Sequence, residues 1–307
     1  MKVNNLVNNT QIEKNLIKTI SSNLSLEKDI LPYSQDSVKL SAKNASINNN
    51  ILFVGMGTGA SYEVKKLKEN LKSENIKVTS ILNSSYRKTN HDGSKTNIIS
   101  INDKNGNTYN LLKAEDISKF VKTLGLTPEQ SEKIEEAINY YDDFARDEIA
   151  KIAEVWAQAE KGEIIPARLL LSGHSTGNGV FGDDNGEVTF EILNKLAKAL
   201  PKAAAQIEDV HISSCYSGGK HSIYSYREIF PNVKTIWGYS RSSPGSTIGA
   251  TEHEKIWEKA TRGEIAFIDR ELAANTRKGE FVSVWSLQNG YSNGKPEKSI
   301  YDIAKDV

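Results

Sequence analysis

The sequence contains a single cysteine, Cys215, among 307 residues. An internal disulfide is therefore impossible, and metal or iron–sulfur sites built from several thiolates are excluded. With no partner inside the chain, Cys215 is either a buried small hydrophobic residue or a reactive thiol. Burial is the commoner fate of a free cysteine, so only the neighbouring residues can argue for a reactive one.

An excess of one charge and long apolar runs are also missing. Lys plus Arg and Asp plus Glu both number 39, so the formal net charge is zero. No whole-chain field then favours nucleic acid or an anionic membrane surface, and no run reaches the roughly 18 apolar residues of a membrane span. The N-terminal residues lack the apolar core of a secretory signal. We expect no nucleic-acid or membrane partner, and a cytoplasmic location or export without a standard signal peptide.

Residues 1–49 are rich in Asn, Ser and Lys. This composition favours a loosely held segment over part of a core. We predict a flexible N-terminal arm or pro-segment over 1–49, which is a candidate for self-processing. One domain is predicted over 50–307.

The pattern after residue 50 is typical of an α/β domain. A short apolar run at Ile51–Val54 ends in glycines, helical spacing follows at Val64, Leu67 and Leu71, and β-branched residues then return. Such a β-α-β unit starts a parallel sheet. Strands and helices continue to alternate, so we predict a mostly parallel central sheet flanked by helices.

Three local signals refine this prediction. Thr127-Pro128-Glu129-Gln130 is a helix start with a capping box, and the helix is expected to continue to about Lys161. The segment Glu280–Leu287 alternates like a late, edge strand. The turn at Asp103–Asn107 predicts a hairpin, and its oxygens are explained better by turn preferences than by calcium binding.

Two apolar strands end in residues that favour chemistry. Leu169–Leu171 leads into Ser172-Gly173-His174-Ser175, and Val210–Ile212 leads into Ser213-Ser214-Cys215. Ligands of open α/β sheets bind at the carboxyl ends of the strands. Parallel neighbours that both end in this way would place His174 beside Cys215.

A thiol becomes a strong nucleophile only after it ionises, and a nearby imidazole can take its proton. We therefore predict that Cys215 is a catalytic nucleophile and that His174 is its general base. The backbone N–H groups of Ser175 and Cys215 are the candidate donors to a developing oxyanion. No adjacent acid or amide clearly orients His174, so a dyad is predicted, and Asp183 and Asp184 are interpreted as turn residues.

These motifs resemble those of the caspase-like cysteine peptidases of clan CD, which include caspases, legumain, clostripain, gingipains and toxin self-processing domains. The shared pattern is a strand into His-Gly, then a hairpin and a helix, then a strand into a small residue and Cys. The resemblance covers about residues 50–250. It implies a caspase-like three-layer sandwich, an endopeptidase acting on peptide or protein substrates through a Cys-His dyad and a thioester, and no cofactor or metal.

The resemblance also implies substrate-binding positions. In the family, the segment after the next strand forms part of the pocket for the residue before the cut, and here it reads Gly238-Tyr239-Ser240-Arg241-Ser242. The predicted substrate-binding residues share a position at a strand end near the dyad: Ser172, Gly173, Ser214, Tyr239, Ser240, Arg241 and Ser242. An acidic residue before the cut is favoured if Arg241 lines this pocket.

Two alternatives stay open. The family usually has Gly after the histidine, whereas this chain has Ser175, so an inactive, peptide-binding or protein-binding relative is one alternative. The other is a nucleotide-binding α/β protein, because Gly55-Met56-Gly57-Thr58-Gly59 follows a strand and opens a helix. The glycine spacing and the missing acidic residue after the second strand count against a dinucleotide.

The predicted arm gives the first test. If the peptidase removes its own arm, incubation of purified protein should produce a fragment that lacks residues from 1–49. The Cys215→Ala variant should keep its full mass, because it has no nucleophile. Intact-mass measurement checks this, and identical masses of the two proteins over time would contradict self-processing.

Overall fold

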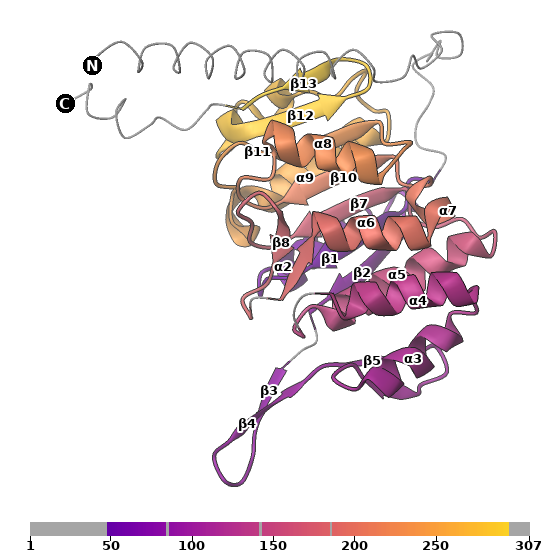
Figure 1. Ribbon diagram of the computed structural model, residues 1–307. Coiled ribbons are helices and arrows are strands. Elements are labelled where there is room, and N and C mark those ends of the chain that lie inside the picture. The colour runs from indigo at the N-terminus through magenta and orange to yellow at the C-terminus, as the bar shows by residue number, and fades with distance from the viewer. Residues whose placement is uncertain (1–47, 84–85, 141–142, 185, 295–307) are drawn as a thin grey trace, which may run out of the picture. The chain divides into compact units, whose positions relative to one another are not determined.

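A seven-stranded sheet runs through the part of the chain that the computed structural model describes, which is residues 48–83, 86–140, 143–184 and 186–294 (Figure 1). From one edge to the other its strands are β13 (Gly290–Ser292), β12 (Val282–Ser286), β11 (Thr235–Tyr239), β10 (Asp209–Ser213), β7 (Arg168–Ser172), β1 (Ile51–Gly55) and β2 (Val78–Leu82). The five strands from β2 to β11 are parallel, and β12 and β13 are antiparallel. The predicted mostly parallel sheet is confirmed. Most of the predicted arm, 1–49, lies outside the described residues.

Both faces of this sheet are apolar. In β1, Ile51 and Phe53 belong to one buried cluster, whereas Leu52 and Val54 belong to another. Successive side chains of a strand point to opposite faces, so a continuous apolar run such as β1 must be covered on both sides. This explains why the chain needs two helical layers.

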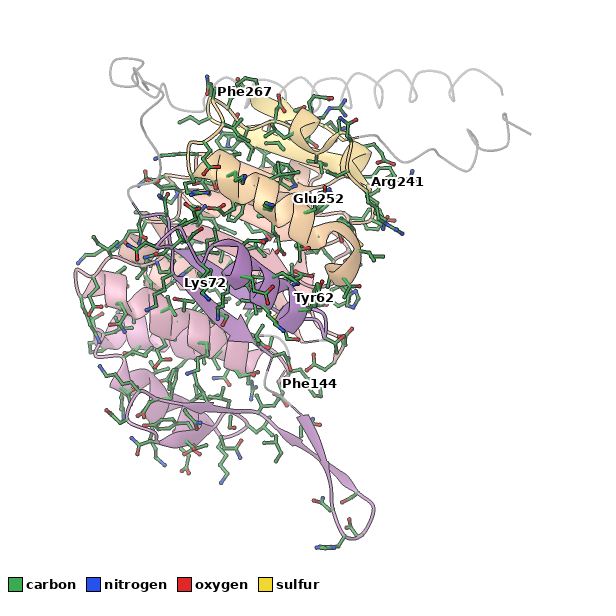
Figure 2. All side chains as sticks on the ribbon, turned by 180° about the vertical axis from the view of Figure 1, so that it is seen from behind. Tyr62, Lys72, Phe144, Arg241, Glu252 and Phe267 are labelled. Atoms are coloured by element: carbon green, nitrogen blue, oxygen red, sulfur yellow. The ribbon has the colours of Figure 1, made fainter. Side chains whose placement is uncertain are left out.

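The two layers are unequal. The helices that supply buried residues to the Leu52 cluster are α3 (Ala114–Thr123), α4 (Pro128–Ile138), α5 (Arg146–Glu160), α6 (Phe190–Ala199), α7 (Pro201–Ala204) and α8 (Lys220–Ile229). The opposite face is covered by α2 (Ala60–Asn70) and α9 (Thr251–Thr261). Figure 2, seen from behind, shows these two helices in front of the sheet. The predicted three-layer α/β arrangement is confirmed.

The remaining elements are short. They are the hairpins β3–β4 (Tyr86–Thr89, Lys95–Ile98), β5–β6 (Ser100–Asn102, Thr108–Asn110) and β8–β9 (Gly179–Phe181, Glu187–Thr189), and the helical turns η2 (Ser246–Ala250), η3 (Arg270–Ala273) and η4 (Gly279–Phe281).

Two predictions are wrong. The helix that starts with the Thr127 capping box ends at Ile138, and a second helix begins at Arg146. The break lets α4 pack against α3 and α6, whereas α5 packs against β2 and β5. The segment predicted as an edge strand is β12, which is covered by β13 on its outer side.

The predicted hairpin at Asp103 is confirmed as β5–β6. The Asp103 carboxylate accepts hydrogen bonds from the N–H groups of Asn105 and Asn107 and from the Tyr109 hydroxyl. Together with the Asn107 side-chain amide, these bonds lower the pKa of Asp103 to about 2. The carboxylate therefore organises the turn. Within the described ranges, no group of three or more His, Cys, Asp or Glu residues is arranged to hold a metal ion.

None of the helices in the described ranges combines the length and the apolar character that crossing a bilayer requires.

Buried carboxyl groups on α2 and α9 make the stability of the protein depend on pH. Glu254 on α9 is fully buried, and burial together with the nearby Glu63 carboxyl raises the pKa of Glu254 well above its ordinary range. The folded state therefore holds this proton to a higher pH than the unfolded state does. This stabilisation is complete below the unfolded pKa and is lost as pH rises toward the folded pKa.

We expect Glu254→Gln to gain stability relative to the wild type by about 1 kcal/mol or more between about pH 5 and pH 8, because only the wild type loses this proton-linked stabilisation and one pKa unit corresponds to about 1.4 kcal/mol. Urea unfolding at both pH values measures the free energy of unfolding of the wild type and of the variant. Glu252→Gln is the control, because Glu252 is exposed on the same helix (Figure 2). An unchanged pH dependence in Glu254→Gln would show that this carboxyl is not the source.

Candidate active site

The ends of β7 and β10 form the centre of the site. These strands are parallel neighbours, and Ser172 of β7 is paired with Ser213 of β10. The Gly173 N–H donates to the Ser213 carbonyl over 3.4 Å, which continues the pairing past the strand end. His174 and Cys215 each lie two residues beyond this last pair. The chain therefore delivers the imidazole and the thiol at the same level of the sheet, from adjacent strands about 4.8 Å apart.

His174 is held by the β8–β9 hairpin. Its N–H donates to the Phe181 carbonyl and its carbonyl accepts from the Phe181 N–H, both over 2.9 Å. The imidazole lies against the Phe181 ring with 5.5 Å between centroids. Gly173 is required for this approach, because a Cβ there would lie 2.8 Å from the Phe181 carbonyl oxygen. The backbone of the predicted base is thus fixed while its side chain stays 56% exposed.

Asp183, at the tip of the same hairpin, contacts the imidazole. Its Oδ1 lies 2.9 Å from His174 Nε2, and its Oδ2 accepts from the Thr58 N–H over 2.7 Å. The bonds from His174 and from the Thr58 backbone hold the pKa of Asp183 below its ordinary range. Interpretation of Asp183 as a turn residue alone missed this contact.

Cys215 lies in a turn that is attached to β11. The Tyr216 N–H donates to the Arg241 carbonyl over 2.7 Å, and the Gly218 N–H donates to the Tyr239 carbonyl over 2.8 Å. Tyr216 adopts a positive φ of 55°, which is uncommon for a residue other than glycine. Cys215 is half-buried, and its Sγ lies 3.7 Å from the Ser243 hydroxyl. The sulfur is therefore not enclosed among aliphatic groups.

The predicted oxyanion donors lie in the loops that follow the two strands, Ser175 after β7 and Cys215 after β10. Ser175 is buried, and its hydroxyl accepts from the Gly177 N–H over 2.9 Å. Its side chain is therefore turned into its own loop. Within the described part of the chain, the backbone N–H groups of Ser175 and Cys215 donate to no protein acceptor.

The other predicted substrate-binding residues divide by exposure. The side chains of Ser172, Ser214 and Tyr239 are buried, with exposures of 3%, 0% and 0%, which limits any part in substrate contact to their backbone. Gly173, Ser240, Arg241 and Ser242 are partly exposed.

Arg241 stands where the parallel strands end. Its guanidinium lies 5.1 Å from the centre of the Phe281 ring. Figure 2 shows Arg241 on the same side of the molecule as Tyr62, near the start of α2. The ammonium group of Lys278 donates to the Ser243 carbonyl over 2.7 Å. One cationic side chain, Arg241, therefore belongs to the segment that follows β11, and a second, Lys278, is bonded to that segment.

The glycine-rich loop after β1 is occupied by protein groups. The Thr58 N–H already donates to a carboxylate, Asp183. A Cβ on Gly59 would overlap the Ser246 hydroxyl, so this glycine serves the packing of the loop against η2. A phosphate at Thr58 would have to displace an anion, and the structure thus gives the nucleotide alternative no support.

The buried histidines contrast with His174. His211, within β10, is fully buried, and burial lowers its pKa well below its ordinary value. Burial also lowers the pKa of His253 to about 4, and its Nδ1 lies 2.8 Å from the Tyr239 hydroxyl. Both are therefore neutral core residues, whereas the His174 side chain is exposed.

No protein-family model matches this sequence, and no curated protein matches it. Among solved structures, the chain is similar to a secreted C11 cysteine protease from Bacteroides thetaiotaomicron, called iotapain, with 10% sequence identity and a TM-score of 0.39. The match covers 78% of this chain and 66% of that chain, so this chain spans less than two thirds of that protein's length. At this identity, the roles of residues in this chain rest on its own geometry.

Two adjacent glycines test the attachment of the Cys215 turn. A Cβ on Gly218 would lie 2.6 Å from the Tyr239 nitrogen and 2.7 Å from the Gly238 carbonyl carbon, whereas a Cβ on Gly219 would meet nothing within 4 Å. We expect Gly218→Ala to push the turn away from β11, to lower the free energy of unfolding by about 1–3 kcal/mol and to slow alkylation of Cys215. Gly219→Ala should resemble the wild type. Urea unfolding and thiol alkylation rates measure both, and equal behaviour of the two variants would contradict the attachment.

Proposed function

We propose that this protein is a cysteine endopeptidase that hydrolyses peptide bonds through a Cys215–His174 dyad. The observation that carries the proposal is the shared register of these residues beyond two paired parallel strands. Parallel strands in register present their following loops to one ligand, and a thiol beside an imidazole is the pair that nucleophilic acyl transfer requires.

The reaction would proceed in two halves. The imidazole of His174 takes the thiol proton, and the sulfur of Cys215 attacks the scissile carbonyl carbon. The tetrahedral intermediate collapses when the C–N bond breaks, and the imidazolium gives its proton to the leaving amine. Water, deprotonated by the imidazole, then attacks the thioester carbon, and cleavage of the C–S bond releases the carboxylate product and restores the thiol.

Backbone donors would stabilise the oxyanion of both tetrahedral intermediates. The N–H groups of Ser175 and Cys215 follow the two strand ends and have no protein acceptor within the described residues. Fixed N–H dipoles of this kind stabilise a developing negative charge without reorganisation. Because the Ser175 hydroxyl bonds within its own loop, serine in place of glycine is compatible with this role.

Substrate would be held by the segment that follows β11, and no cofactor takes part in the reaction. Ser240, Arg241 and Ser242 are partly exposed there. If Arg241 contacts the substrate, it favours an acidic side chain before the cut, and Lys278, which donates to the Ser243 carbonyl, adds positive charge beside this segment. An inactive relative would use the same surface for binding without turnover.

Substitution of the dyad tests the proposal. On a peptide library, Cys215→Ala should abolish turnover, because the chain has no other thiol. His174→Ala should lower kcat by about 10²–10⁴-fold, the usual contribution of a general acid–base group. His91→Ala is the control, since His91 is exposed in the turn between β3 and β4. Turnover that survives in Cys215→Ala would remove the proposal, and binding of peptides without any turnover in the wild type would favour the inactive relative.

A further inference from the structure

The hairpin tip carries a carboxylate whose two oxygens have different partners. Asp183 Oδ1 faces His174 Nε2 at 2.9 Å, and Asp183 Oδ2 accepts from the Thr58 N–H at 2.7 Å. We infer that Asp183 is a positioning residue that fixes which ring nitrogen of His174 carries the proton. The inference rests on the proposed function, in which His174 is the base for Cys215.

The carboxylate dictates the tautomer because it has only acceptors to offer. The hydrogen bonds from His174 and Thr58 hold the pKa of Asp183 below its ordinary range. The carboxylate is therefore ionised at any pH above the ordinary pKa of an aspartic acid. An ionised carboxylate cannot donate a hydrogen bond. The proton between Asp183 and His174 must therefore be on Nε2, which leaves Nδ1 as the nitrogen with a free lone pair. Nδ1 is then the atom that accepts the proton of the thiol.

The position of the carboxylate is set by the β1–α2 loop. Gly182, next to Asp183, is packed so closely on this loop that a Cβ there would lie 2.6 Å from the Met56 carbonyl oxygen. The turn is closed by the bond from the Gly182 N–H to the Gly186 carbonyl. Asp184 accepts from the Gly186 N–H and from the Asn83 amide, at the end of β2. The hairpin thus lies across the carboxyl ends of β7, β1 and β2.

The isosteric substitution Asp183→Asn tests the inference, because the Thr58 N–H determines which way the new amide points. In Asp183→Asn, the amide should place its oxygen toward Thr58, because an NH₂ group at that position would set a donor against the donating Thr58 N–H. Its NH₂ group then faces His174 Nε2 and requires that nitrogen to accept. The ring proton would move to Nδ1, and the imidazole would present a donor where the thiol needs a base. Asp183→Ala removes the carboxylate but imposes no tautomer, since water can accept from Nε2.

We therefore expect Asp183→Asn to be the more damaging of the two substitutions. An amide that replaces an orienting carboxylate costs about 10⁴-fold in kcat when it enforces the wrong tautomer in a buried site. Here the aspartate and histidine side chains are 45% and 56% exposed, so a loss of about 10²-fold in kcat, with little change in KM, is expected for Asp183→Asn. Asp183→Ala should lose only about tenfold or less, because water can replace the carboxylate as the acceptor from Nε2.

The experiment measures kcat and KM on a cleaved peptide together with the rate at which iodoacetamide alkylates Cys215 at about pH 6.5, where a free thiol is largely protonated. The variants are Asp183→Asn, Asp183→Ala and His174→Ala. Asp184→Asn is the matched control, because it changes the neighbouring carboxylate and keeps an oxygen for the Gly186 N–H. Thermal unfolding shows whether each variant is folded.

The order of the variants decides the outcome. Alkylation in Asp183→Asn that falls to the rate of His174→Ala, with Asp183→Ala between that rate and the wild type, supports the inference. Equal rates in the wild type and Asp183→Asn, or a greater loss in Asp183→Ala than in Asp183→Asn, would overturn it. Alkylation reports on the thiol without any substrate, so this readout stands even if Cys215→Ala shows that the protein is not a peptidase.

Discussion

The in-register pairing of β7 with β10 is the constraint on which the site depends. Leu169 opposite Val210 and Leu171 opposite Ile212 pack on one face of the sheet, and Leu170 lies opposite the buried His211. A slip of one residue would move every one of these side chains to the wrong face. The buried residues of the two strands therefore set the level at which His174 and Cys215 leave the sheet, although none of them takes part in the proposed chemistry.

Each residue of the proposed dyad is fixed by the element next to it on the side away from the other residue. Toward β1, the hairpin holds the backbone of His174 through Phe181 and its imidazole through Asp183. Toward β11, the backbones of Tyr216 and Gly218 attach the Cys215 turn to the Arg241 and Tyr239 carbonyls. The site is thus a pair of clamped loops on a rigid sheet, the kind of support that preorganised catalytic groups require. Both clamps work mainly through backbone groups, so many side-chain types are compatible with them.

Sequence reasoning could predict what depends on local pattern. Apolar runs identified β1, β7 and β10, the Thr127 capping box identified the start of α4, and the two strand ends identified His174 and Cys215 as neighbours. It could not predict what depends on pairing between distant segments. The contact of Asp183 with His174 depends on the register of the hairpin. The burial of Tyr239 depends on α9, whose His253 contacts the Tyr239 hydroxyl. The break between α4 and α5 arises because each helix packs against a different part of the fold, which periodicity along the chain does not reveal.

A crystal structure of the protein with a peptide electrophile bound to Cys215 would test the central claim most directly. We expect a covalent bond from the sulfur to the peptide, with Nδ1 of His174 on the side of the sulfur and Nε2 on the side of Asp183. The carbonyl oxygen of the peptide should accept from the Ser175 and Cys215 N–H groups. An unmodified sulfur, or an imidazole turned away from a modified one, would contradict it.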